Sequence, residues 1–176
     1  TGGSQGIGRG VVERLTAGGW RVVNLDRERP RSVAAGELYI EVDLAGAEAT
    51  AQALAQATGL CAIDALVNNV GTVQPAPLED VTLEDLDKVV SLNLRCTIQC
   101  AQALLPGMKA RRYGRIVSIS SRAALGKELR TVYAATKAGL HGITRTWALE
   151  LGRHGITVNA IGPGPIATEL FERVNP

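Results

Sequence analysis

The chain opens with Thr1-Gly2-Gly3-Ser4-Gln5-Gly6-Ile7-Gly8, a glycine-rich turn that leads directly into a stretch with helical spacing. Apolar side chains recur at positions 7, 11, 12 and 15, which predicts an amphipathic helix. Glycines let the backbone turn sharply and let a diphosphate approach the N–H groups at the start of a helix. The order Gly-x-x-x-Gly-x-Gly differs from the commoner Gly-x-Gly-x-x-Gly fingerprint, although the mechanics would be the same. A loop that only needs glycine is the alternative, because the chain has 20 glycines.

The next element separates these two interpretations. Residues 20–25 have the composition of a strand and lead to Asp26, which stands 18 positions after Gly8. An acidic side chain about 20 residues past the glycines is where the ribose 2′-hydroxyl of a dinucleotide is held. A 2′-phosphate would bring a second negative group within a few ångströms of Asp26, so we expect NAD rather than NADP. Arg27 follows directly and would offset part of that repulsion.

Strands and helices alternate along the rest of the chain, which is typical of an α/β fold with a Rossmann-type, doubly wound parallel sheet and helices on both faces. We predict further strands at 37–42, 62–67, 115–121 and 155–161, and helices at 46–58, from 81 onward and from 132 to about 153. Ligands of such sheets bind at the carboxyl ends of the strands. The glycine-rich turn, Asp26, Asp43 and residues 69–71 all follow strands, so we expect one cleft to collect them.

Composition argues against several other classes of protein. The net charge is only +2, from 19 basic and 17 acidic residues, and 3% of the residues are aromatic, which makes nucleic-acid binding a poor fit. No apolar stretch of about 18 residues exists, so we expect no membrane span. Cys61, Cys96 and Cys100 form no Cys-x-x-Cys pattern, which argues against a metal site or disulfide framework and favours a cytoplasmic, reducing setting.

The stretch Val132-Tyr133-Ala134-Ala135-Thr136-Lys137-Ala138-Gly139 carries the candidate chemistry, and it has a helical composition. Residues four apart share a helix face, so the ammonium of Lys137 would lie beside the phenol of Tyr133 and lower its pKa from about 10. Such a pair alone is a weak signal. Ser121, 12 positions before Tyr133 at the end of a predicted strand, adds a hydroxyl that could polarise a carbonyl. Asn93, amid apolar neighbours, is either a satisfied core amide or part of this site.

Together these motifs resemble the short-chain dehydrogenase/reductase family, and the resemblance runs the whole length of the chain. The matching segments are Thr1-Gly2 with Gly6-Ile7-Gly8, Asp43-Leu44, Asn68-Asn69-Val70-Gly71, Asn93, Ser121, Tyr133 with Lys137, and Pro163-Gly164-Pro165-Ile166-Ala167-Thr168. The resemblance implies that Tyr133 is the general acid/base, that Lys137 holds the nicotinamide ribose and lowers the pKa of the tyrosine, and that Ser121 orients the carbonyl. It also implies that Asn93 anchors a proton-relay water, and that Ile166 and Thr168 meet the nicotinamide carboxamide.

The residues that we expect to bind the cofactor come from the glycine-rich turn, from the strand ends and from the catalytic helix. They are Gly2, Ser4, Gln5, Gly6, Ile7, Gly8, Asp26, Arg27, Asp43, Leu44, Asn69, Val70, Gly71, Tyr133, Lys137, Pro163, Ile166 and Thr168. The nearest branch of the family is similar to 3-oxoacyl-carrier-protein reductases and to sugar or polyol dehydrogenases.

The sequence departs from the family pattern at three points. Val70 replaces the usual alanine of the Asn-Asn-Ala-Gly motif, and contacts made by the backbone should survive this change. Asp26 fits NAD, whereas many carrier-protein reductases use NADP. The chain also begins inside the phosphate loop, and the family's first and last strands are missing. We therefore expect residues 1–176 to be a single NAD(P)-binding domain excerpted from a longer chain, with unpaired edges in the middle of the sheet.

The sequence thus predicts an NAD(H)-dependent oxidoreductase that interconverts a secondary alcohol and a ketone by hydride transfer, with Tyr133 as the general acid/base. An NADP-dependent 3-oxoacyl-carrier-protein reductase and a non-catalytic dinucleotide-sensing protein of the same fold are the alternatives. The resemblance further implies a homotetramer or homodimer that packs through the helices bearing Asn93 and Tyr133.

Overall fold

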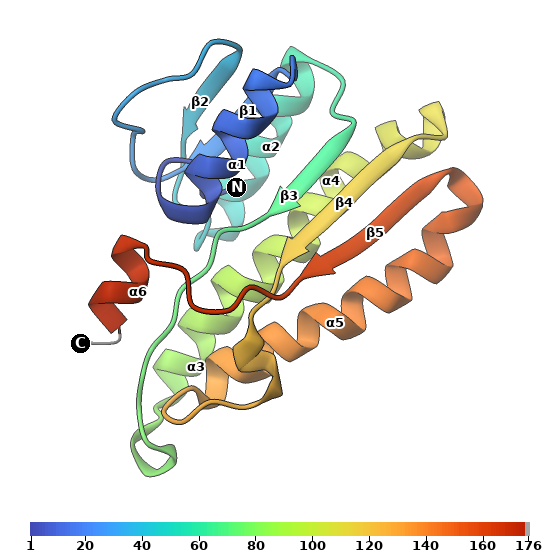
Figure 1. Cartoon of the computed structure of the whole chain (residues 1–176). Helices are drawn as coiled ribbons and strands as arrows, with labels where there is room; N and C mark the ends of the chain where they lie inside the picture. The colour runs from blue at the N-terminus through green and yellow to red at the C-terminus, as the bar shows by residue number, and fades with distance from the viewer. Residues whose placement is uncertain (175–176) are drawn as a thin grey trace.

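Five parallel strands form the centre of the computed structural model, which describes residues 1–174 (Figure 1). They are β1 (Val22–Asp26), β2 (Glu37–Glu41), β3 (Ala65–Asn68), β4 (Gly114–Ile119) and β5 (Ile156–Ile161). The strands make two sheets: β1 pairs with β2, while β4 lies between β3 and β5. Parallel pairing with intervening helices confirms the predicted α/β class.

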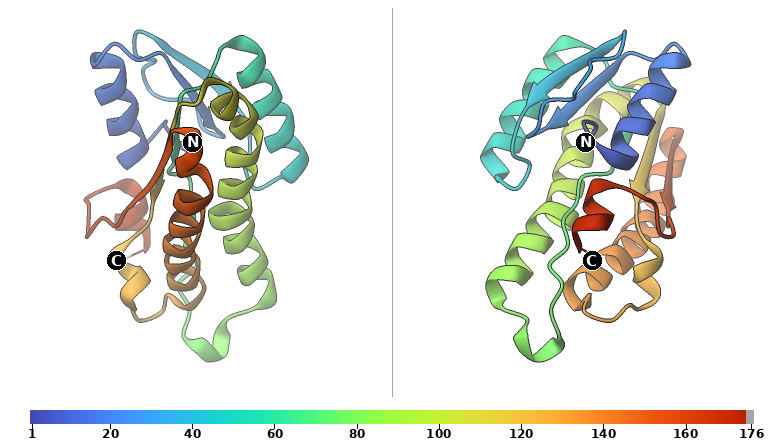
Figure 2. Two further views of the ribbon diagram at one scale, coloured as in Figure 1. Left: turned by 90° about the vertical axis from the view of Figure 1, so that its right-hand side faces the viewer. Right: turned by 60° about the vertical axis from the view of Figure 1, so that its left-hand side comes forward.

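The helices cover both faces of this arrangement, as predicted. They are α1 (Gly6–Ala17), α2 (Ala47–Leu60), α3 (Leu83–Val90), the π-helical turn η2 (Ser91–Arg95), α4 (Cys96–Arg111), α5 (Thr131–Leu151) and α6 (Glu169–Val174), with short 3₁₀ turns η1 (Leu78–Asp80), η3 (Arg122–Leu125) and η4 (Gly152–His154). Helix α1 packs on one face of β1, whereas α2, α4 and α5 stand in a row on the opposite face (Figure 2). The long helix expected from residue 81 onward is the run α3–η2–α4, and Thr82 caps it by accepting a hydrogen bond from the N–H of Asp85 (3.1 Å).

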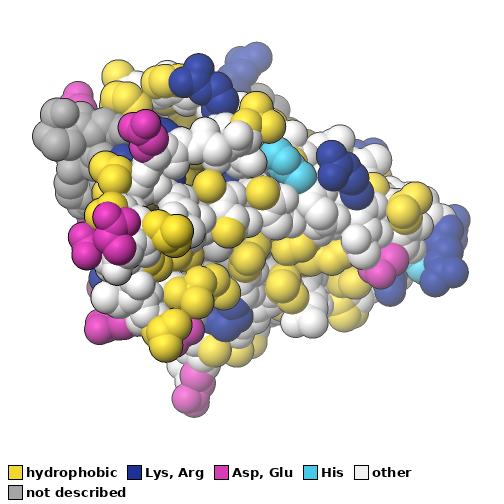
Figure 3. All heavy atoms as spheres, turned by 90° about the horizontal axis from the view of Figure 1, so that it is seen from below, with side chains coloured by type: hydrophobic (Ala, Val, Ile, Leu, Met, Phe, Trp, Pro, Cys, Tyr) yellow, Lys and Arg dark blue, Asp and Glu magenta, His cyan; other side chains and the backbone are white. Residues whose placement is uncertain are grey.

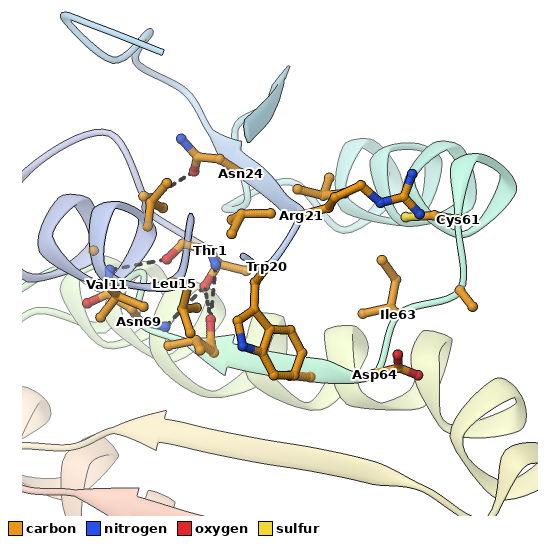
Figure 4. A pocket seen from close by; sticks show the side chains of 18 residues that line it. Thr1, Val11, Leu15, Trp20, Arg21, Asn24, Cys61, Ile63, Asp64 and Asn69 are labelled. Atoms are coloured by element: carbon orange, nitrogen blue, oxygen red, sulfur yellow. Dashed lines mark hydrogen bonds between the residues drawn. The ribbon is translucent and has the colours of Figure 1, made fainter. Parts of the chain in front are cut away.

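A slot separates the two sheets at the position where the family's first strand was expected to be missing. The facing edges of β1 and β3 do not pair with each other, and a cavity of about 230 Å³ lies between them (Figure 4). Val11, Leu15, Trp20 and Ile63 contribute its apolar lining. Thr1 enters the slot at the carboxyl end of β3, where its amino group donates a hydrogen bond to the carbonyl of Val67 (2.9 Å). Unpaired strand edges in the middle of the fold were the predicted consequence of that missing strand, and the structure has them.

The connection from β1 to β2 contains no helix. Residues 27–36 form a ten-residue loop, although parallel strands usually need a crossover of a dozen or more residues. The loop includes Pro30, and it closes at Gly36, whose φ of +85° suits glycine. The carbonyl of Gly36 accepts a hydrogen bond from the N–H of Val22 (2.9 Å), so the loop returns the chain to the start of β1.

The core lies between the sheets and the row of helices α2 and α4. It includes Leu54 of α2, Leu104 and Met108 of α4, and Ile116 of β4, each with at most 6% of its surface exposed. Helix α4 approaches β4 so closely that a Cβ on Gly114 would stand 2.7 Å from the sulfur of Met108. Glycine at this position therefore lets helix and strand pack directly.

No helix within residues 1–174 combines the length and the apolar character that crossing a bilayer requires.

Candidate active site

A cleft of about 460 Å³ opens at the carboxyl ends of the strands. It is lined by Gly2, Gln5, Gly6, Ile7, Gly8, Asp26, Arg27, Asp43, Leu44, Asn69, Val70, Gly71, Ser121, Tyr133, Lys137, Pro163, Ile166 and Thr168. Seventeen positions that the sequence assigned to a cofactor therefore surround one space, together with the candidate hydroxyl of Ser121. Its volume is within the range of small-molecule sites. Ser4 and Asn93 are the two predicted site residues that lie outside its lining.

Ser4 faces the interior and helps to hold the glycine-rich turn on β1. Its N–H donates a hydrogen bond to Oδ2 of Asp26 (2.9 Å), and its hydroxyl accepts one from Nδ2 of Asn24 (3.2 Å). Oδ1 of Asn24 also accepts a hydrogen bond from the N–H of Gly3 (2.9 Å). The structure thus places Ser4 outside the lining of the cleft, 5% exposed and bonded to β1, and its contact with a cofactor stays a prediction.

The turn fits a diphosphate group on geometric grounds. Gly6 begins α1 with a φ of +51°, and the residues of the first turn of α1 line the cleft. The first N–H groups of a helix have no partners within the helix, so they favour an anion at this end. A Cβ on Gly8 would meet the carbonyl oxygen of Gly2 at 1.8 Å, which excludes any larger residue there. The turn can therefore bring backbone N–H groups close to a ligand.

Residues 69–71 brace this turn from the other side of the slot. Nδ2 of Asn69 donates to the carbonyls of Thr1 (3.1 Å) and Gly2 (2.9 Å). Val70 contributes its N–H, which donates to the hydroxyl of Thr1 (3.1 Å). The substitution of alanine by valine at position 70 leaves this backbone contact in place, as expected from the sequence.

Ser121, Tyr133 and Lys137 come from two elements that meet at the cleft. Ser121 follows β4 and caps η3, where its hydroxyl accepts a hydrogen bond from the N–H of Ala123 (3.1 Å). Tyr133 and Lys137 lie one turn apart on α5, with the ammonium nitrogen of Lys137 5.6 Å from the centre of the Tyr133 ring. That nitrogen donates to the carbonyl of Ile119 (2.7 Å), and the lysine is 5% exposed.

The charges of this trio differ from the sequence expectation. Burial raises the pKa of the Tyr133 phenol above its ordinary value, while a hydrogen bond with Ser121 and the positive charge of Arg130 act in the opposite direction. Burial also lowers the pKa of Lys137 to about 8. Lys137 was expected to lower the pKa of Tyr133, but the cation that does so in this structure is Arg130.

Asn93 lies behind the cleft wall, in the π-helical turn between α3 and α4. Its Oδ1 accepts a hydrogen bond from the N–H of Thr72 (2.8 Å), and its Nδ2 donates to the carbonyl of Thr72 (3.0 Å) and to the hydroxyl of Thr136 (3.1 Å). Thr136 in turn donates to the carbonyl of Tyr133 (2.9 Å). The side chain of Asn93 therefore joins the loop after β3 to α5, and its part in anchoring a relay water stays a prediction.

Sequence reasoning missed Asn24, Thr136 and Arg130. A polar residue between Val23 and Leu25 in an apolar strand was a signal for Asn24, which is 1% exposed and bonds to the glycine-rich turn. Thr136 gave no separate signal, since it stands beside Lys137 in the same helix. Arg130 lies among charged neighbours in a loop, and nothing local distinguishes it from a solvated side chain.

The family model for short chain dehydrogenases matches residues 1–176. The L-xylulose reductase of Bos taurus is 40% identical over 182 residues, covering 97% of this chain and 71% of its own. The 3-oxoacyl-[acyl-carrier-protein] reductase of Synechocystis sp. is 36% identical over 189 residues, covering 99% of this chain and 76% of its own.

The comparison with solved structures gives the same family as the comparison of sequences. A 3-oxoacyl (acyl-carrier-protein) reductase from Agrobacterium tumefaciens with NADP bound superimposes with a TM-score of 0.89 and 31% identity, over 99% of this chain and 70% of that one. With the glycine-rich turn, Ser121, Tyr133 and Lys137 around one cleft, the chain belongs to the short-chain dehydrogenase family, whose members are oxidoreductases acting on alcohol and keto groups with NAD or NADP.

Proposed function

We propose that the protein interconverts a secondary alcohol and a ketone by hydride transfer with NAD(H), and that Tyr133 is the general acid/base. The observation that carries this proposal is the shared cleft, in which Ser121, Tyr133 and Lys137 lie together with the glycine-rich turn and Asp26. A dinucleotide seated along the turn would place its nicotinamide end near the three polar side chains.

The chain's own residues supply positioning and proton transfer. The bound cofactor supplies the hydride that is exchanged with the carbinol carbon. In the reductive direction Ser121 donates a hydrogen bond to the carbonyl oxygen, and Tyr133 gives its phenolic proton to the same oxygen. The positive charge of Arg130 stabilises the phenolate left behind, and Lys137, with a pKa of about 8, is protonated at neutral pH and adds a second cation one helical turn from Tyr133. Solvent then restores the proton to Tyr133.

The proposed preference for NAD rests on Asp26. One carboxylate oxygen accepts the N–H of Ser4 and the other accepts the N–H of Glu28 (3.1 Å), which holds the charge at the mouth of the glycine-rich turn. A 2′-phosphate there would face this carboxylate. The measurement is kcat/KM with NADH and with NADPH on one ketone. A ratio above about ten in favour of NADH is expected, and a preference for NADPH would instead favour the carrier-protein reductase alternative.

The catalytic proposal is tested by Tyr133→Phe. The variant keeps the ring and loses the proton, so turnover should fall by at least about a thousandfold while the dissociation constant for NADH changes less than threefold. Steady-state rates and fluorescence titration of NADH measure the two quantities. Turnover close to that of the wild type would remove Tyr133 from the mechanism.

The rival function is a dinucleotide-sensing protein that binds NAD(H) without chemistry. A sensor needs the glycine-rich turn and Asp26 but has no use for Ser121, Tyr133 and Lys137 together. A broad panel of alcohols and ketones separates the two functions, since binding of NADH without turnover on any member would favour the sensor.

We also propose a homotetramer or homodimer in the cytoplasm. Seen from below, hydrophobic side chains spread over the middle of the face and most charged ones lie toward its periphery (Figure 3). Exposed leucines include Leu83 at the start of α3 and Leu149 near the end of α5, at 79% and 86%. Cys61, Cys96 and Cys100 are free thiols, which suits a reducing compartment. Light scattering of the purified protein measures the oligomeric state.

A further inference from the structure

Ser120 stands between the end of β4 and Ser121, and the proposed reaction does not use it. The residue is only 3% exposed, although it lines the cleft together with Ser121, Tyr133 and Lys137. Its hydroxyl donates a hydrogen bond to the backbone carbonyl of Lys137 (2.8 Å). A buried hydroxyl on the wall of the cleft is thus used to hold the backbone of α5.

The same end of β4 makes a second hydrogen bond with Lys137. The carbonyl of Ile119 accepts it from the ammonium nitrogen of the lysine (2.7 Å). Two consecutive residues therefore hold the two ends of one lysine: Ile119 binds the ammonium and Ser120 binds the backbone. A lysine side chain has many rotamers, and fixing both of its ends selects the few that span the two points.

Ser120 is itself fixed by the sheet. Its N–H donates to the carbonyl of Ile161 (2.7 Å), which extends the pairing of β4 with β5 past the last residue of β4. The next residue is Ser121, whose hydroxyl binds the substrate carbonyl in the proposed reaction. The positions of Ser121 and Lys137 are consequently set from one point at the carboxyl edge of the sheet.

The catalytic helix is held at a second point from another direction. Thr136 donates to the carbonyl of Tyr133 (2.9 Å) and accepts a hydrogen bond from Asn93 (3.1 Å). These contacts fix Thr136 from the side of η2, whereas Ser120 fixes the neighbouring Lys137 from the side of β4. The first turns of α5 are therefore attached to two different elements by side-chain hydrogen bonds.

From these contacts we infer that Ser120 is a positioning residue for the proposed reaction, and that its hydroxyl keeps the ammonium of Lys137 at its place, 5.6 Å from the centre of the Tyr133 ring. The inference rests on the proposed function and adds to it a residue that acts through Lys137. Groups that take part in proton transfer must be held within a fraction of an ångström, and a misplacement of about 1 Å costs up to about a hundredfold in rate. Loss of the hydroxyl should therefore lower turnover more than it lowers stability.

The experiment removes the hydroxyl and compares turnover with stability. Ser120→Ala deletes it, and Ser120→Cys replaces it with a thiol, which is a weaker donor. The matched control is Thr144→Val, which removes a hydroxyl that donates to the carbonyl of Leu140 (2.7 Å) on the same helix, outside the lining of the cleft. Ser120→Ala and Thr144→Val each delete one hydrogen bond to a carbonyl of α5, so the Tm should fall by about 2–4 °C in both.

Turnover should separate the variants. In Ser120→Ala, kcat with the ketone of the panel that the wild type reduces fastest should fall by at least about tenfold. The dissociation constant for NADH should change less than about threefold, because the glycine-rich turn and Asp26 are unaltered. Ser120→Cys should recover part of the lost kcat, and Thr144→Val should keep kcat within about twofold of the wild type.

A second measurement reports on Lys137 without any turnover. The chain has four lysines, so labelling lysine with ¹⁵N gives four side-chain signals, and Lys137→Met identifies the one that belongs to Lys137. An ammonium that is buried and hydrogen-bonded exchanges its protons with water more slowly than a solvated one. At about pH 6, proton exchange of this signal should be at least about tenfold faster in Ser120→Ala than in the wild type, and unchanged in Thr144→Val.

Several results would overturn the inference. Unchanged proton exchange of Lys137 in Ser120→Ala, or a kcat equal to that of the wild type, would show that packing alone positions the lysine, and either leaves the proposed function standing. Equal losses of kcat in Ser120→Ala and Thr144→Val would reveal a general loosening of α5. A wild type that reduces no member of the panel would overturn the proposed function and this role of Ser120 with it, even if proton exchange responds as expected.

Discussion

At the scale of one residue, Lys137 lowers the stability of the folded protein, because its charged side chain is buried in the candidate active site. Its ammonium is buried, and it donates a hydrogen bond to a neutral acceptor, the carbonyl of Ile119. Burial disfavours the charged form and lowers the pKa from 10.5 to about 8. The folded protein therefore binds fewer protons than the unfolded chain between these two values, so stability rises with pH across that window and the full penalty is present below about pH 8.

Lys137→Met should consequently make the protein more stable at pH 7 and inactive. A shift of this size corresponds to about 3 kcal/mol, from which about 1 kcal/mol is subtracted for the lost hydrogen bond to Ile119, leaving a net gain of about 2 kcal/mol. The gain should shrink as pH rises from about 8 to 10.5, because the wild-type lysine loses its charge in the folded protein before it does so in the unfolded chain. Urea unfolding at pH 7 and pH 10 measures it, with the exposed Lys109→Met as the control. A variant less stable than the wild type at both pH values would contradict this account.

At the scale of elements, Glu37 joins β2 to α1 and β1. Its carboxylate is fully covered and accepts hydrogen bonds from Arg9 (2.9 and 3.2 Å), from Nδ2 of Asn24 (3.0 Å) and from the N–H of Ala34 (2.9 Å). Asn24 in turn holds Gly3, so this carboxylate supports the glycine-rich turn from behind. Burial alone would raise the pKa of Glu37, but these hydrogen bonds outweigh it and lower the pKa below 4.5.

Glu37→Gln should lower the free energy of unfolding by about 3 kcal/mol at pH 7, because the amide of glutamine turns N–H groups toward the surrounding donors and the ion pair between Arg9 and Glu37 is lost, which leaves Arg9 only its more exposed pair with Glu13 (3.5 Å). The stabilisation by a carboxylate with a lowered pKa is present above the unfolded value and is lost as pH falls through the folded value. The gap between variant and wild type should therefore narrow below about pH 4. Denaturant titrations at pH 7 and pH 3.5 measure it, and Glu41→Gln, exposed on the same strand, should be neutral at both.

At the scale of the whole molecule, the two sheets are held together by helices rather than by strand pairing. Helices α2 and α4 pack against each other and bridge the slot between β1 and β3. The amino group of Thr1 already donates a hydrogen bond to the carbonyl of Val67, and the N–H of Gly2 donates one to the carbonyl of Leu25. A parallel strand in the slot would continue this hydrogen-bonding pattern on both sides. Unpaired backbone groups of the two strand edges and apolar side chains line the rest of the slot between β1 and β3.

An engineered extension of five β-branched residues before Thr1 should fill this slot and pair with both edges. Four to six new backbone hydrogen bonds and buried apolar side chains would raise the Tm by about 5 °C or more. Thermal unfolding followed by circular dichroism measures the shift, and amide exchange should slow in β1 and β3. A Gly-Ser extension of equal length is the control. Equal melting temperatures for the two extensions would show that the slot does not accept a strand.

The sequence alone determined the order of strands and helices, the glycine-rich turn with Asp26, and the alignment of Ser121, Tyr133 and Lys137 on one cleft. These follow from local signals, since glycine spacing, strand ends and the four-residue helical repeat are properties of neighbouring positions. Even the gap between β1 and β3 followed from the resemblance to a family with one more central strand.

Only the tertiary structure decided which polar side chains face the cleft. Ser4 and Asn93 turn inward to bond with Asn24 and Thr136, whereas Arg130, from an unremarkable charged loop, turns into the cleft beside Tyr133. The direction of a side chain in a loop or a π-helical turn depends on partners tens of residues away, and the pKa of Tyr133 depends on burial and on Arg130 rather than on spacing to Lys137. Sequence spacing fixes which residues are neighbours along an element, but desolvation and long-range hydrogen bonds arise only when the elements pack.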